Sequence, residues 1–138
     1  MFLFIPEFYY ICNRYMRKQM ITRDKDKILE VKSELMDKLK EENAFWSYDR
    51  QSVSLATIND ADLIAMTMRY LDLPEIKQLF AIFPYKKIKD AWKNILVPEG
   101  SYLYTLNRFF AWYYFKAKNP DAYLKSLETR HINRMAQL

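Results

Sequence analysis

The sequence contains one glycine, one cysteine and one histidine among its 138 residues. Glycine supplies left-handed turns and the loops that cradle phosphates, so this scarcity excludes a Walker loop and a dinucleotide-binding fingerprint. The single cysteine, Cys12, excludes a disulfide within the chain and a zinc site built on cysteines, and His131 alone excludes a histidine-rich metal site. Catalytic carboxylate pairs and nucleophile elbows are also missing, so we assign no catalytic residue, no cofactor and no metal ligand.

The chain is rich in hydrophobic residues, at 51%, and carries 28% charged residues, which is the balance of a globular protein rather than a disordered one. Its length is enough for one domain with a core, and scarce glycine favours helices over turn-rich sheets. The lone cysteine fits a reducing compartment, and we expect the cytoplasm.

The net charge of +5 is unevenly distributed along the chain. Residues 85–138 hold ten basic and four acidic side chains, for a net charge of +6. This carboxy-terminal third is therefore the place to expect an anionic partner. The alternative, which we favour, is a solvated basic surface with no specific ligand.

The most unusual stretch is 102–115, in which eight of fourteen residues are aromatic. No glycine or proline interrupts it, so a helix is predicted over about 103–117. Its inward face is predicted to hold Leu103, Leu106, Phe110, Tyr113 and Ala117, but aromatic residues also fall elsewhere on the wheel. A helix that is apolar almost all round needs cover on several sides, so we expect an all-α domain of five or six short helices around it.

The remaining helices are predicted from apolar periodicity, caps and prolines, over 24–42, 59–72, 74–83, 85–96 and from 120 onward. Residues 21–138 read as a single helical domain. Residues 1–20 form an apolar and basic extension that is too short to span a bilayer and lacks the features of a signal peptide. This extension packs on the core, anchors at a membrane surface, or precedes a true start at Met16 or Met20, and we favour the last reading.

Three aromatic residues, Phe45, Trp46 and Tyr48, lie within four positions between polar flanks. We interpret this segment as a loop that places Phe45 and Trp46 in the core, because large aromatic side chains are usually well buried. The alternative is an exposed anchor for a protein partner, since Trp and Tyr dominate binding hot spots.

The predicted helices over 74–83 and 85–96 meet at Pro84, and the second carries Lys86, Lys87, Lys89 and Lys93. Such a hairpin has the outline of a helix-turn-helix, and its lysines suit phosphates better than base edges. The alternative is an ordinary helical hairpin with a solvated lysine face, which we favour. DNA binding by this hairpin requires the four lysines to lie together, exposed and clear of acidic groups.

Several stretches occur in a characteristic order: Phe45-Trp-Ser-Tyr-Asp49, Leu63-Ile64, Tyr70-Leu-Asp-Leu-Pro-Glu-Ile-Lys-Gln-Leu-Phe80, Ile88-Lys-Asp-Ala-Trp92, Leu106-Asn-Arg-Phe-Phe-Ala-Trp112, Tyr114-Phe115 and Lys118-Asn-Pro-Asp-Ala-Tyr123. Together they resemble a family of small, uncharacterised bacterial proteins over about residues 43–127. Members of that family often lie beside nucleotidyltransferase-type toxins, so the resemblance implies an antitoxin-like role. The shared residues are mostly aromatic and aliphatic, so they specify a fold and carry over no functional residue.

Two functions follow as expectations. The first is a non-enzymatic protein–protein interaction module, an antitoxin-like partner of a bacterial toxin, which predicts a contiguous apolar or aromatic surface patch. The second is a DNA-binding regulator that uses the 74–96 hairpin.

Overall fold

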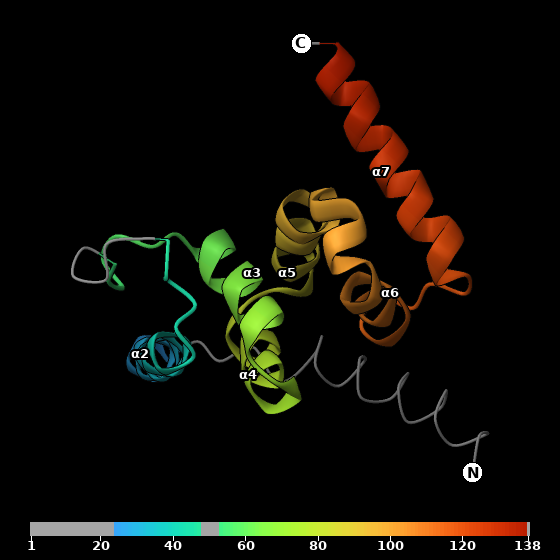
Figure 1. Cartoon of the computed structure of the whole chain (residues 1–138). Helices are drawn as coiled ribbons and strands as arrows, with labels where there is room; N and C mark the ends of the chain where they lie inside the picture. Colours follow the sequence, from blue (N-terminus) through green and yellow to red (C-terminus); the bar gives the residue numbers. More distant parts are fainter. Residues whose placement is uncertain (1–23, 48–52, 138) are drawn as a thin grey trace. The chain divides into compact units, whose positions relative to one another are not determined.

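The computed structural model describes residues 24–47 and 53–137, and the regular structure within these ranges is helical, with no strand among them (Figure 1). The all-α class predicted from the sequence is confirmed. The chain divides after Ile88 into two compact units, which are described in turn. The single domain over 21–138 stays a prediction, and the extension over 1–20 lies outside the described residues.

The N-terminal unit is built on three helices that pack against one another: α2 (Lys25–Glu41), α3 (Asp60–Tyr70) and α4 (Leu73–Ile82). Their bounds lie within two residues of the predicted ones. Each helix contributes an apolar face to the core of this unit, and the buried side chains include Leu35, Met36, Leu39, Leu63, Ile64, Met68, Ile76, Leu79 and Phe80.

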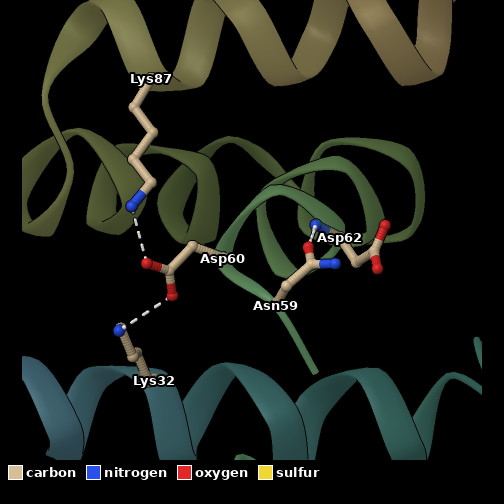
Figure 2. Close-up of polar contacts among 5 residues, drawn as sticks. All are labelled: Lys32, Asn59, Asp60, Asp62 and Lys87. Carbon is tan, nitrogen blue, oxygen red and sulfur yellow. Dashed lines mark hydrogen bonds and ion pairs between the residues drawn. The ribbon is translucent and has the colours of Figure 1, made fainter. Parts of the chain in front are cut away.

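Side-chain caps define where two of these helices begin. The Asp24 carboxylate accepts a hydrogen bond from the amide of Asp26 at 3.0 Å, and the Asn59 side chain accepts one from the amide of Asp62 at 2.8 Å (Figure 2). These bonds satisfy amides that have no partner within their helix. Asp60 and Asp62 therefore occupy the first turn of α3, where carboxylates complement the helix dipole.

The segment after α2 turns sharply at Asn43, whose φ of 57° lies in the left-handed region. The amide of Ala44 donates to the carbonyl of Leu39 at 3.0 Å, which folds the chain back onto the helix. Phe45 is consequently buried, with 3% of its surface exposed, whereas Trp46 is 71% exposed. The prediction that both rings enter the core is confirmed for Phe45 and wrong for Trp46, because the turn brings only the first ring to the core.

Helix α5 (Tyr85–Ala91) leads into the C-terminal unit, where the chain continues as a π-helical turn, η1 (Trp92–Leu96), and a 3₁₀ segment, η2 (Val97–Leu103). The predicted helix over 85–96 is thus α-helical only to Ala91. Pro98 lies in the first turn of η2. A proline lacks only an amide that a first turn leaves unpaired, so it fits this position.

The C-terminal unit is completed by α6 (Tyr104–Tyr113) and α7 (Pro120–Ala136), which pack against each other and against η2. Helix α6 ends before the predicted residue 117, because Lys116 adopts a left-handed φ of 57° and the amide of Ala117 closes back on the carbonyl of Ala111 at 2.9 Å. The Asn119 side chain caps α7 by accepting a hydrogen bond from the amide of Ala122 at 3.2 Å.

The buried side of α6 differs from the predicted one. Asn107, Phe110, Ala111 and Tyr114 are buried, whereas Leu103, Leu106, Tyr113 and Ala117 are only half-buried. The helix is rotated because the polar side chain of Asn107 finds two buried partners in η1. Among the described residues, no helix combines the length and apolar character needed to cross a membrane.

Candidate interaction surface

The outward side of α6 carries a line of large side chains. Tyr104, Arg108 and Trp112 are spaced four residues apart, so they lie above one another along the helix. All three are exposed, and Trp112 keeps 49% of its surface in contact with solvent. The predicted helix was expected to need cover on several sides, but α6 remains uncovered at Trp112.

Three aromatic rings of this side touch one another. The rings of Phe109 and Tyr113 are stacked with centroids 5.2 Å apart. The centroid of the Trp112 ring lies 6.2 Å from that of Phe109 and 6.0 Å from that of Tyr113, so this ring contacts both. Phe109 and Tyr113 are half-buried, and the cluster is therefore anchored in the unit while one ring projects. We call Tyr104, Arg108, Phe109, Trp112 and Tyr113 the aromatic face.

A carboxylate on α7 fixes the polar edge of the aromatic face. Asp121 accepts a hydrogen bond from the hydroxyl of Tyr104, and Arg108 Nε lies 3.1 Å from an oxygen of the same carboxylate. The hydrogen bond to this carboxylate raises the pKa of the Tyr104 phenol, because ionisation would place two negative charges side by side. Both side chains are thus held in place beside the ring cluster, as the polar rim of a binding surface requires.

The buried side chain of Asn107 sets the orientation of α6 and therefore of the aromatic face. The residue is 2% exposed, and its side-chain amide accepts from the indole nitrogen of Trp92 at 3.0 Å and donates to the carbonyl of Leu96 at 3.0 Å. Trp92 is itself fully buried and stacks on Phe115 with ring centroids 4.5 Å apart. Because a buried amide needs partners for its donor and acceptor, these bonds fix the rotation of α6 and hence which rings face outward.

The four candidate nucleic-acid-binding lysines are not all clear of acidic groups. In the N-terminal unit, Lys87 Nζ lies 2.7 Å from one oxygen of Asp60, and Lys32 Nζ lies 3.1 Å from the other (Figure 2). The Lys87 hydrogen bond, together with Lys32, lowers the pKa of Asp60. Both ammonium groups also lie over the Phe83 ring, 5.2 and 5.4 Å from its centre. Lys86 is exposed.

In the C-terminal unit, Lys93 Nζ lies 3.8 Å from the carboxylate of Asp90. The Lys89 ammonium lies 5.8 Å from the centre of the Tyr123 ring, and both lysines are half-buried. Two of the four lysines, one in each unit, therefore already have acidic partners. Of the four lysines, Lys86 is the one that is exposed and has no acidic partner among the described residues, so the arrangement that DNA binding by the hairpin requires is not met.

The three candidate partner-binding aromatic residues differ in their exposure to solvent. Phe45 is part of the core of the N-terminal unit, Trp46 is exposed, and Tyr48 lies outside the described residues. Trp46 is thus the member of this group that the structure presents to solvent.

Sequence reasoning missed the aromatic face as a surface. The signal was present, since Phe109 and Trp112 fall outside the predicted inward face of the 103–117 helix. Their position was attributed to cover by neighbouring helices. The rotation of α6 about Asn107, which leaves Trp112 outward, depends on contacts with η1 that periodicity does not reveal.

Within the described ranges, no group of three His, Cys, Asp or Glu side chains is arranged to hold a metal ion. A scan against protein-family models, a search of curated proteins and a search of solved structures each found no match to this chain.

Proposed function

We propose that this chain is a non-enzymatic protein–protein interaction module, an antitoxin-like partner of a bacterial toxin in the cytoplasm. The aromatic face is the observation that carries the interaction part of this proposal. It joins a projecting tryptophan, two supporting rings and an arginine held by Asp121. Trp, Tyr and Arg are the residues that most often dominate protein interfaces.

Preorganisation strengthens the case for this surface. The contacts within the ring cluster restrict its side chains before a partner arrives, so less rotamer entropy remains to be lost on binding. Trp46 in the N-terminal unit is more exposed, at 71% against 49% for Trp112, but the aromatic face groups several contacting rings and therefore better matches a hot spot surrounded by water-excluding neighbours.

The proposal that the partner is a toxin rests on the family resemblance over residues 43–127. Nucleic-acid binding by the hairpin is less well supported, because Lys87 and Lys93 are paired with Asp60 and Asp90. Phosphate binding at those positions would require these ion pairs to be broken or shared.

The test uses tagged full-length protein expressed in its native cells and recovered at low and high salt. The wild-type chain is expected to retain one protein through the high-salt wash, and Trp112→Ala to lose it. Trp46→Ala is the matched control, because it removes the same side chain from an exposed site in the other unit and should retain the partner.

The recovered protein is then expressed alone and together with the wild-type chain. We expect it to arrest growth alone and to be neutralised by the wild-type chain but not by Trp112→Ala. Recovery of nucleic acid that is lost steeply with salt, with no protein retained, would instead favour the hairpin as a phosphate binder.

A further inference from the structure

The second half of α7 has no cover from the rest of its unit. Leu124 and Leu127 are buried, but the helix continues to Ala136, and residues 129, 130 and 132–137 are all exposed. Figure 1 shows these last turns, coloured red, running away from α6. Ile132 and Met135 project from them with 64% and 59% of their surfaces exposed.

The spacing of the core-facing side chains in the buried half continues into this exposed half. Leu124, Leu127, His131 and Met135 keep a three-and-four spacing, so the core-facing side of α7 extends beyond the core. Arg130 and Arg134 lie one turn apart on the flank, and residues 129–138 contain no acidic side chain. We call residues 129–137 the basic end of α7.

A surface of matching chemistry lies on the exposed side of α2. Five acidic residues are spaced by four, four, three and four positions and are all exposed: Asp26, Glu30, Glu34, Asp37 and Glu41. At 3.6 residues per turn they fall within an arc of about 80° and extend over about 22 Å. Leu29, 57% exposed, lies beside them. We call this row the acidic stripe.

We propose that the basic end of α7 docks on the acidic stripe of a second copy of this chain. Arg130 and Arg134 are separated by one helical turn, about 6 Å along the axis, and so are Glu30 and Glu34. Two arginine–carboxylate pairs can therefore form in register, and arginine binds carboxylates through two parallel hydrogen bonds.

A second copy joined head to tail is favoured over a symmetric pairing of like faces. Two basic ends would oppose arginines and two acidic stripes would oppose carboxylates, and like charges repel. The contact therefore joins unlike faces, and it can close as a reciprocal two-fold pair or continue head to tail into a ring or a short chain. Outside residues 1–23, which carry a net charge of +3, the chain has the same polarity, with −2 over residues 24–88 and +4 over 89–138.

This contact uses neither Trp112 nor the rest of the aromatic face, so it stands apart from the proposed function. Few side chains take part, and exposed ion pairs contribute little each, so the association is weak and sensitive to salt. A dissociation constant on the order of 10–100 μM in dilute salt is expected.

The test is sedimentation of the full-length chain up to about 200 μM, a concentration above the expected dissociation constant, in about 50 and 500 mM salt. The wild type is expected to associate in low salt and to dissociate in high salt. Glu30→Lys/Glu34→Lys and Arg130→Glu/Arg134→Glu should each weaken self-association by about tenfold or more. An equimolar mixture of the two variants should associate again, because each reversed face then meets an oppositely charged one.

Lys118→Glu/Lys125→Glu is the matched control. It changes the net charge as much as the arginine reversal does, at exposed sites outside the basic end, and should leave association intact. Circular dichroism melts verify folding, and the milder pairs Glu30→Gln/Glu34→Gln and Arg130→Gln/Arg134→Gln replace any variant that fails to fold. A wild type that stays monomeric in low salt, variants that associate normally, or a mixture that fails to restore association would each overturn the proposal.

Discussion

The buried Asn107 amide gives the sharpest test of how the C-terminal unit is held together. In Asn107→Ala the indole nitrogen of Trp92 loses its acceptor at 3.0 Å, and the carbonyl of Leu96 loses its donor at 3.0 Å. Both groups belong to buried residues, where water does not readily replace the lost partner. The substitution therefore leaves two buried polar groups, the Trp92 indole N–H and the Leu96 carbonyl, without the side-chain partner that Asn107 provides.

The magnitude follows from these two groups. A buried polar group left without a partner costs about 1–3 kcal/mol. Partial relaxation of η1 reduces the sum, so a loss of about 2–4 kcal/mol in the free energy of unfolding is expected. Such a loss is a large part of the total stability of a domain.

The assay is urea unfolding of the full-length chain, followed by circular dichroism. Trp92→Phe, measured alone and with Asn107→Ala, completes a double-mutant cycle, and a coupling of about 1 kcal/mol is expected for residues in direct contact. A loss below about 0.5 kcal/mol for Asn107→Ala, the range typical of surface substitutions, would refute the role assigned to this amide.

Two further predictions concern the cores and ion pairs of the units. Phe110→Ala, at a residue 1% exposed, should lower the free energy of unfolding by about 3–5 kcal/mol, and unchanged thermal stability would contradict its place in the core. Because Lys87 and Lys32 lower the pKa of Asp60 in the folded state, their contribution to stability is present above the unfolded pKa and is lost as pH falls below about 4. In Asp60→Asn the part of the free energy of unfolding that is lost on acidification below about pH 4 should be smaller by this contribution. An unchanged dependence of stability on pH in this variant would count against the ion pairs of Asp60 with Lys87 and Lys32. Since Asp60 is partly exposed, this contribution should amount to less than about 1 kcal/mol.

The helices of the N-terminal unit were predictable because their signals are local. Asp24 and Asn59 cap α2 and α3, and Pro74 occupies the first turn of α4, as their positions in the sequence indicate. Each of these signals acts within one helical turn, so no distant contact is needed to interpret it.

The structure differs from the sequence-based predictions where contacts between residues far apart in the sequence determine the orientation of a side chain or helix. The rotation of α6 depends on bonds from Asn107 to Trp92 and Leu96, which lie 15 and 11 residues away. Trp46 is exposed because the turn at Asn43 brings only Phe45 to the core. The lysines of α5 formed a plausible phosphate-binding row in the sequence, but the partner of Lys87 is Asp60, 27 residues earlier.

The candidate surface was therefore only partly predictable. The concentration of aromatic residues over 102–115 correctly marks the most distinctive helix, and a surface patch was expected of an interaction module. Which ring would project could not be read from periodicity, since a helix with aromatic residues on several sides offers several equivalent rotations.

The most direct test of the central claim is calorimetric titration of the recovered partner protein into the wild-type chain and into Trp112→Ala, with matched melting temperatures showing that both are folded. If the aromatic face is the binding surface, Trp112→Ala should weaken binding by about thirtyfold or more, as removal of a hot-spot tryptophan does. Equal affinities for the two chains would contradict the claim and place the binding surface elsewhere on the molecule.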